Sequence, residues 1–133
     1  MDTPLHVAVG VIQDERGRVL VALRHSSQHQ GGLWEFPGGK LELGESAEAA
    51  LTRELSEELG IDVLRAEPFL QLTHAYSDRS VLLDCWLVLD YRGEPQGRES
   101  QPLAWRAVSE LVADDFPTGN KPIIDKLKGW KRD

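Results

Sequence analysis

Three glutamates, Glu54, Glu57 and Glu58, form the most chemically informative cluster in this 133-residue sequence. Spacings of three and four residues place side chains next to one another on one face of a helix. Like charges at these spacings repel one another and destabilise a helix by about 0.2–0.5 kcal/mol per pair. A divalent cation bound among them turns the repulsion into attraction, so the spacing predicts a metal site and a reaction that needs a metal.

The expected ligands are all oxygen atoms, which suits magnesium. Mg²⁺ prefers octahedral oxygen coordination and is usually held by one or two carboxylates together with substrate phosphates and water. Glu57 and Glu58 can supply two carboxylates from one helical turn, and Glu54 can supply a third. The tight backbone path available at the two glycines 38–39 can bring a carbonyl oxygen to the same point. Mg²⁺ is therefore the expected cofactor, with Mn²⁺ as the alternative.

The three glutamates belong to a longer pattern between Gly39 and Ile61. It runs Gly39, five residues, Glu45, seven residues, Arg53-Glu54-Leu55, one residue, Glu57-Glu58, one residue and Gly60-Ile61. Arg53 is the only basic residue between positions 41 and 64, whereas solvated helices rich in glutamate usually intersperse lysine or arginine. All specified positions match the Nudix box, so the chain resembles hydrolases that act on nucleoside diphosphates linked to another group.

This resemblance implies a role for each polar position of the box. In such enzymes the carbonyl of the residue at Gly38 and the carboxylates at Glu57 and Glu58 bind metal. Glu54 is implied both as a ligand and as the candidate base for the attacking water. Arg53 is expected to orient one glutamate by charge-assisted hydrogen bonds.

Two residues outside this set complete the expected catalytic site. Glu45 is expected to pair with Arg53 and hold the preceding loop to the helix. Relatives of this kind draw a metal ligand or a base from a loop opposite the box helix, and Glu99 in GRESQP fits that place. The resemblance therefore leaves open whether Glu54 or Glu99 is the base.

Segments outside the box resemble the MutT-type members of the family, over nearly the whole chain. These segments are HVAVGVIQ, LWEFPGGKLELGE, RGEPQGRESQP and ADDFPTGNKPIIDKLK. MutT-type members hydrolyse 8-oxo-dGTP to 8-oxo-dGMP and pyrophosphate, which removes a mutagenic precursor from the nucleotide pool. The resemblance implies a nucleotide pocket that contains Arg24, Phe36, Tyr76, Arg79 and Asn120. Tyr76 departs from the pattern, which has phenylalanine there; its ring can still stack on a base, and its hydroxyl can shift the base preference.

Asn120 is the residue best suited to recognise an oxidised base. Oxidation at C8 turns guanine N7 into a donor and leaves O6 an acceptor, and one asparagine amide can accept from N7–H while donating to O6. In unmodified guanine N7 is an acceptor, so it would face the amide oxygen of Asn120, which is also an acceptor. A buried polar group left unpaired in this way costs about 1–3 kcal/mol. Asn120 also suits the N-cap of a helix that starts near Pro122, and the two roles are compatible.

Two other functions stay open on the sequence alone. One is a Nudix pyrophosphatase for another nucleotide, such as a pyrimidine triphosphate, because enzymes with many substrates share the box. The other is a non-catalytic module that binds a nucleotide with metal and releases no pyrophosphate.

The helices that must position these residues follow from caps and periodicity. Ser46 as N-cap and Gly60 as C-cap delimit a helix over 47–59, in which apolar residues recur every four positions. Its carboxylates flank the apolar stripe, at the margin of the core. A terminal helix with Pro122 in its first turn is expected to face inward through Ile123, Ile124 and Leu127.

The strands follow from runs of β-branched and aliphatic residues. Residues 5–13 and 18–24, joined by the polar turn 14–17, predict a hairpin. Two long strands at 67–76 and 80–91 and a short one near 104–108 are also expected, with loops at 26–32, 77–79 and 114–120. Strands that occur both in hairpins and around helices favour an α+β fold. The resemblance to the Nudix family implies more specifically an α/β/α sandwich, the Nudix fold, with a central mixed sheet flanked by helices.

Composition and charge limit the cellular role. At 133 residues, of which 41% are hydrophobic and 28% charged, the chain is expected to form a single soluble domain over residues 1–133. A monomer is expected, although nothing in the composition fixes the oligomeric state. The net charge of −7 argues against a nucleic-acid polymer as partner and leaves a free nucleotide as the expected substrate. The single cysteine, Cys85, is expected to be buried and inert. The start of the chain lacks a signal peptide or membrane-spanning pattern, so a cytoplasmic location is expected.

Overall fold

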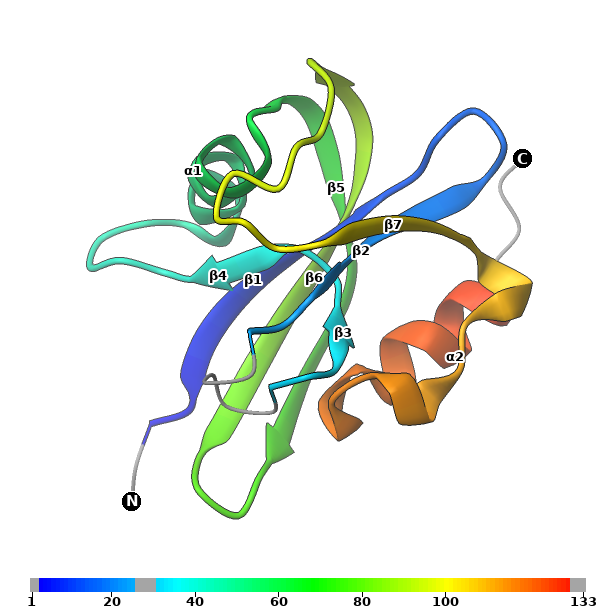
Figure 1. Cartoon of the computed structure of the whole chain (residues 1–133). Helices are drawn as coiled ribbons and strands as arrows, with labels where there is room; N and C mark the ends of the chain where they lie inside the picture. Colours follow the sequence, from blue (N-terminus) through cyan, green and yellow to red (C-terminus); the bar gives the residue numbers. More distant parts are fainter. Residues whose placement is uncertain (1–2, 26–30, 130–133) are drawn as a thin grey trace.

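Two β-sheets and two α-helices form the fold within the described residues, 3–25 and 31–129, of the computed structural model (Figure 1). The first sheet has the strand order β4 (Gly38–Lys40), β1 (Leu5–Ile12), β6 (Ser80–Arg92) and β5 (Asp62–Ala75). It is mixed, because β1 runs parallel to β6 while the other pairs are antiparallel. The second sheet is antiparallel, with the order β3 (Trp34–Glu35), β2 (Arg18–Leu23) and β7 (Leu103–Ala107).

The helix predicted over 47–59 is confirmed as α1 (Ala47–Leu59). The Ser46 hydroxyl accepts a hydrogen bond from the amide of Ala49 at 3.1 Å, as an N-cap should. Gly60 ends the helix at φ 72°, a left-handed conformation that favours glycine. The apolar stripe of α1 is fully buried: Ala50, Leu51, Leu55 and Leu59.

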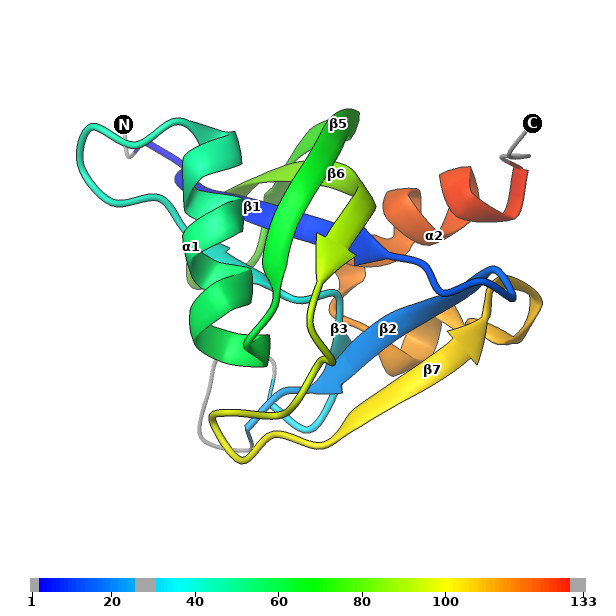
Figure 2. The same ribbon diagram turned by 90° about the horizontal axis from the view of Figure 1, so that it is seen from above.

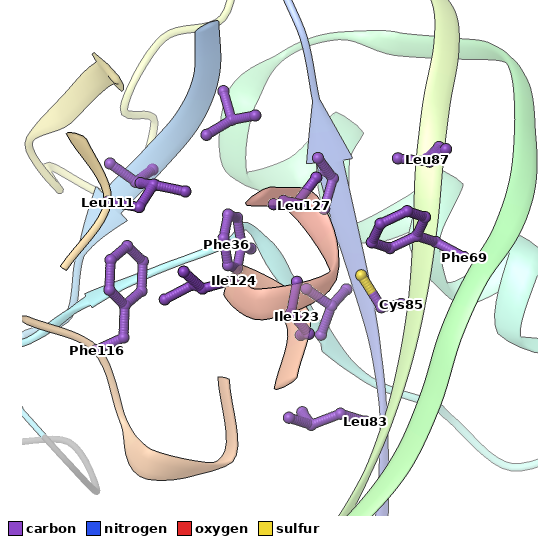
Figure 3. Close-up of a cluster of buried hydrophobic side chains, with 14 of the residues drawn as sticks. Phe36, Phe69, Leu83, Cys85, Leu87, Leu111, Phe116, Ile123, Ile124 and Leu127 are labelled. Carbon is purple, nitrogen blue, oxygen red and sulfur yellow. The ribbon is translucent and has the colours of Figure 1, made fainter. Parts of the chain in front are cut away.

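The two α-helices cover opposite faces of the mixed sheet (Figure 2). On one face, α1 packs over Ala8 and Ile12 of β1 and Val88 of β6. On the other face, α2 (Lys121–Gly129) inserts Ile123, Ile124 and Leu127 into a second core that contains the side chains in Figure 3. The predicted α/β/α sandwich with a central mixed sheet is confirmed, and the small antiparallel sheet closes the second core.

The predicted hairpin at 5–24 is wrong in its pairing, although its strands and its turn are present. β1 and β2 share only an isolated bridge between Gln13 and Val19, and the turn is held by Asp14. Each strand has two edges, and those of β1 are occupied by β4 and β6. β2 therefore pairs with β3 and β7 in the second sheet.

The other expected elements are present with shifted ends. β5 begins at Asp62, earlier than predicted, and its register shifts near Pro68, where a strand residue without an amide proton is tolerated. The loop predicted at 114–120 is largely 3₁₀-helical, with η2 (Ala113–Asp115) and η3 (Thr118–Asn120) after η1 (Val108–Glu110). Most of the loop predicted at 26–32 lies outside the described residues. No helix in the described part of the chain has the length and apolar character needed to cross a membrane.

Candidate active site

One cleft of about 320 Å³ is lined by most of the residues that the sequence analysis assigned to the site. The first group comes from the box and its N-terminal flank: Gly38, Gly39, Glu54 and Glu58. The second group comprises all five expected nucleotide contacts: Arg24, Phe36, Tyr76, Arg79 and Asn120. The cleft also has an apolar wall from β1 and β6, formed by Val7, Val9, Val81 and Leu83. The fold therefore joins a carboxylate cluster, polar side chains and an apolar surface that a base can lie on.

The two glycines of β4 leave no room for a side chain. A Cβ added at Gly38 would overlap the backbone carbonyl of Ala8 in β1, and one added at Gly39 would overlap the carboxyl group of Glu54. The amide of Gly38 also donates a long hydrogen bond of 3.3 Å to Glu58 Oε2. β4 thus lies directly between β1 and the carboxylates of α1.

Arg53 is the centre of a hydrogen-bond network on α1. Its Nε and Nη2 donate to the two carboxylate oxygens of Glu45 at 2.7 and 2.8 Å, the paired geometry expected from the sequence. Its Nη1 donates to Glu54 Oε1 at 2.8 Å, and Nη2 also donates to the carbonyl of Lys40 at 3.2 Å. Glu57 Oε2 lies farther away, at 3.5 Å from Nη1. The guanidinium therefore orients Glu54 and ties the 41–45 loop to the helix.

Glu58 is the most strongly perturbed carboxyl group of the cleft. Burial is the main cause that raises its pKa to about 9. Neighbouring negative charges raise this pKa further, in the order Glu54, Glu35 and Glu99. A carboxylate that is buried among other carboxylates is stabilised in its charged form by a cation, so the electrostatics of the site favour a bound metal.

Glu54 has the position and environment of a candidate base. Burial raises its pKa, while the hydrogen bond and charge of Arg53 oppose that rise. The negative charges of Glu57 and Glu99 also raise the pKa of Glu54. A carboxylate with a raised pKa is a better proton acceptor than an exposed one, provided that a water molecule can reach it from the cleft.

Glu99 is brought to the C-terminal end of α1 by its loop. The carbonyl of Glu58 accepts hydrogen bonds from the amide of Arg98 at 3.0 Å and from Gln101 Nε2 at 3.2 Å. The other end of the same side chain, Gln101 Oε1, accepts from the amide of Glu99 at 2.8 Å. Glu58 and Glu99 consequently line one adjacent cleft, although they are 41 positions apart in the sequence. Nothing in the sequence indicated that Gln101 would bridge Glu58 and Glu99 in this way.

The side chains expected to bind metal do not form a compact cluster in the structure. Within the described ranges, no three His, Cys, Asp or Glu side chains stand close enough together to hold a metal ion. Glu57 points toward solvent, since its side chain is 58% exposed and lines neither cleft. The donors are nevertheless all oxygens that repel one another, which is the chemistry that Mg²⁺ or Mn²⁺ fits.

Asn120 is the buried polar residue of the cleft, with 8% of its surface exposed. It ends η3, and its amide donates to the carbonyl of Pro117 at 2.9 Å. Among the residues that the structure describes, its side-chain amide forms no hydrogen bond, so it does not cap α2. Buried polar groups are rarely left unpaired, and an amide that lines a cleft in this state is suited to pairing with a ligand.

Arg24 and Arg79 line the cleft in different ways. Arg24 Nη1 donates to Glu35 Oε1 at 2.6 Å, and this ion pair is largely shielded from solvent. Glu35 was missed by the sequence analysis, although burial raises its pKa and it contributes to the negative field at Glu58. Its signal in the sequence was only a charged residue between two aromatic ones. Arg79 is about half exposed at the mouth of the cleft.

The two aromatic residues predicted for the pocket have different surroundings. The ring of Phe36 is 2% exposed and stacks on Phe116 with centroids 5.3 Å apart, so it belongs mainly to the core (Figure 3). Tyr76 lies directly after β5, and its hydroxyl oxygen accepts a hydrogen bond from the amide of Gly119 at 2.8 Å. Burial raises the pKa of Tyr76. The hydroxyl that distinguishes this chain from the family pattern is thus engaged with the segment that carries Asn120.

The fold and the carboxylate site together define a Nudix protein, and comparison with known proteins confirms this. The NUDIX domain family matches residues 8–126. The chain belongs to this family.

Its relatives include enzymes with two named substrates. An 8-oxo-dGTP diphosphatase of Escherichia coli strain K12 is 44% identical over 124 residues, which cover 93% of this chain and 96% of that protein. A CTP pyrophosphohydrolase of the same strain is 37% identical over 117 residues, which cover 88% of this chain and 87% of that protein. Among solved structures, one from work on MutT of Aliivibrio salmonicida and Vibrio cholerae has a TM-score of 0.81 and 33% identity, covering 96% of this chain and 98% of its own.

Proposed function

We propose that this protein is an 8-oxo-dGTP diphosphatase, which hydrolyses 8-oxo-dGTP to 8-oxo-dGMP and pyrophosphate with Mg²⁺ as cofactor and Mn²⁺ as a possible substitute. The observation that carries the proposal is the buried amide of Asn120, which has no side-chain partner among the described residues and lies in the same cleft as Glu54 and Glu58. The similarity to 8-oxo-dGTP diphosphatases over most of the chain supports it. Removing this nucleotide keeps an oxidised precursor out of DNA replication and so prevents mutation.

Base selection rests on Asn120. Its amide oxygen accepts from N7–H of the oxidised base while its amide nitrogen donates to O6. Both halves of this buried group, which has no partner in the described part of the chain, are then satisfied. With dGTP, the amide oxygen faces the N7 lone pair instead. Sites that are built to hydrogen-bond one group can reject analogues that lack it by a factor of about 10⁴.

The phosphates extend toward the carboxylates of α1. We assign the metal ligands to the Gly38 carbonyl and to the carboxylates of Glu54, Glu57, Glu58 and Glu99. The bound metal supplies screening of the phosphate charges and stabilisation of the oxygens that become more negative during the reaction. With a net charge of −7, the protein carries an excess of negative charge and cannot screen the phosphates by its overall charge.

The reaction itself is a displacement at the β-phosphorus. Glu54 takes a proton from a water molecule, whose oxygen bonds to the β-phosphorus as the bond from that phosphorus to the α–β bridging oxygen breaks. The bridging oxygen leaves with the nucleoside monophosphate, and the water oxygen leaves with pyrophosphate. Arg53 keeps Glu54 oriented through its 2.8 Å hydrogen bond, and Glu99 is the alternative base.

We further propose that the protein works as a single-domain monomer on free nucleotides in the cytoplasm. The acidic net charge disfavours both nucleic-acid polymers and anionic membrane surfaces as partners. The nucleotide pool is located in the cytoplasm.

Pyrophosphate release from a nucleotide panel tests the function. The panel contains 8-oxo-dGTP, dGTP, CTP and dCTP, each with and without Mg²⁺. We expect Mg²⁺-dependent release that is fastest with 8-oxo-dGTP. In Asn120→Ala, the preference for 8-oxo-dGTP over dGTP should largely disappear. Asn120→Asp is the matched variant, because it keeps the shape of the side chain but cannot donate to O6.

The same panel distinguishes the alternatives. The similarity to a CTP pyrophosphohydrolase favours a pyrimidine triphosphate as the second candidate substrate. That function would give the fastest release with CTP or dCTP, and Asn120→Ala would hardly change the ratio between the two purine substrates. Nucleotide binding with Mg²⁺ but without pyrophosphate release from any member of the panel would indicate a non-catalytic module.

A further inference from the structure

Tyr76 and Gly119 form a contact between two segments that lie far apart in the sequence. Tyr76 follows β5, whereas Gly119 lies in η3, immediately before Asn120. The amide of Gly119 donates to the Tyr76 hydroxyl oxygen at 2.8 Å, and the bond is partly buried. The Tyr76 ring is held in turn by an edge-on contact with His74, with ring centroids 4.5 Å apart.

The two residues are also complementary in shape. A Cβ added at Gly119 would lie 2.7 Å from the Tyr76 hydroxyl oxygen, closer than real Cβ atoms approach other atoms. The next contact, with the Cβ of His74, would be 3.2 Å, which is tight but within reach of a small shift. The hydroxyl therefore occupies the space that a side chain at position 119 would need. The glycine is required here by this contact, since its φ is not in the left-handed region.

We propose that Tyr76 is a positioning residue for base recognition, whose hydroxyl holds the backbone of Gly119 so that the adjacent Asn120 amide meets the edge of the base. This inference rests on the proposed function, because it assumes that Asn120 selects the nucleotide. The hydroxyl is the feature by which Tyr76 departs from the family pattern. Its proposed role is to orient Asn120, and not to contact the base directly. Among the described residues the Asn120 side chain forms no hydrogen bond, so its direction is set by its backbone. That backbone is held by the hydrogen bond from the Asn120 amide to the carbonyl of Pro117 and, one residue earlier, by the bond from the Gly119 amide to the Tyr76 hydroxyl.

The test is the ratio of kcat/KM for 8-oxo-dGTP to kcat/KM for dGTP. In Tyr76→Phe, the ratio should fall by about 3- to 10-fold, the effect of one partly buried hydrogen bond. The loss should lie mainly in KM for 8-oxo-dGTP, because contacts with the base are made in the ground state and in the transition state alike. A general loss of stability would instead lower the activity on both substrates together.

Gly119→Ala provides an independent second measurement. Its Cβ meets the tyrosine hydroxyl, so we expect a larger loss of the ratio than in Tyr76→Phe. The double variant Tyr76→Phe/Gly119→Ala should recover part of this loss, because removing the hydroxyl makes room for the methyl group. Tyr91→Phe is the matched control, since Tyr91 is the only other tyrosine in the sequence. It lies near the C-terminal end of β6, whereas Tyr76 lies just before the strand begins. It should leave the ratio as in the wild type.

Each outcome has a distinct meaning. A wild-type ratio near one overturns the proposed function and this inference with it. A high wild-type ratio that Tyr76→Phe leaves unchanged overturns the inference alone. Losses that simply add in the double variant also overturn it, because they would show that the two residues act independently.

Discussion

At the scale of single residues, Arg53 decides how the carboxylates of α1 are arranged. One guanidinium binds both oxygens of Glu45 and one oxygen of Glu54, so the loop carboxylate and the candidate base share a single cation. A planar guanidinium presents its donors in a fixed fork, which a lysine ammonium cannot reproduce. The orientation of Glu54 is therefore set by covalent geometry at Arg53 as much as by the helix.

The ion pair between Glu45 and Arg53 predicts a pH dependence of stability. The hydrogen bond from Arg53, followed by that from the amide of Glu42, lowers the pKa of Glu45 from 4.5 to about 2. The contribution of Glu45 is therefore present above pH 4.5 and is lost as the pH falls toward 2. Glu45→Gln should be less stable than the wild type near neutral pH, and its stability should decline less steeply in this acidic window.

Urea unfolding at a series of pH values measures this effect. Glu67→Gln, which removes an exposed carboxylate on β5, is the control and should decline like the wild type. Parallel curves for Glu45→Gln and the wild type would show that the pair contributes nothing to the acid response.

Glu54 and Glu99 are distinguished as bases by isosteric substitution. Glu54→Gln removes the proton acceptor but keeps the shape, so kcat should fall by about 10²- to 10⁴-fold while the melting temperature changes little. Glu99→Gln should lose less, since Glu54 remains available to the water. Turnover by Glu54→Gln close to that of the wild type would exclude Glu54 as the base and leave Glu99. Steady-state kinetics at saturating Mg²⁺ make the comparison.

At the scale of elements, β4 connects the sheet to the carboxylates. Its three residues pair with β1, and its second glycine lies against Glu54. Neither contact is readable from the sequence, in which the two glycines only indicated a tight backbone path. The helix over 47–59 was predictable to the residue because its caps and apolar spacing are local features. The split of the expected hairpin into two sheets was not, because it depends on which strands compete for the edges of β1.

The two glycines of β4 should fail in different ways when each is replaced by alanine. In Gly38→Ala, the new methyl group meets the backbone carbonyl of Ala8, which cannot move without breaking the sheet, so stability should fall by about 2 kcal/mol or more. In Gly39→Ala, it meets the end of the flexible Glu54 side chain, so the fold should persist while activity is lost. Thermal unfolding and pyrophosphate release on both variants test this. Equal loss of stability in the two would contradict it.

At the scale of the whole molecule, the two cores on either side of the mixed sheet have separate tasks. The core under α1 supports the carboxylates, and the core under α2 supports Asn120, which directly precedes that helix. Lys126 of α2 donates to the carbonyl of Phe69 and lies over its ring, 4.7 Å from the centroid, so it fastens α2 to β5. Correct docking of α2 is thus a condition for the proposed nucleotide pocket.

Cys85 reports on that docking because it is buried in the α2 core, as predicted (Figure 3). Burial raises its pKa to about 12, so the native thiol should react very slowly with thiol reagents at mildly alkaline pH. In Lys126→Met, which keeps the length of the side chain, labelling should be about 3- to 10-fold faster. Lys128→Met removes an exposed charge from the same helix and is the control. Identical labelling of the two variants would show that Lys126 does not hold α2.

The sequence by itself determined the chemistry of the box, the family and the layered α+β architecture. These features follow from residue types at short, regular spacings, and local physical chemistry acts on such spacings directly. Only the tertiary structure decided which distant residues meet: Gly39 with Glu54, Gln101 with Glu58 and Glu99, and Tyr76 with Gly119. These contacts depend on strand pairing and on helix docking across many residues, and no local pattern encodes them.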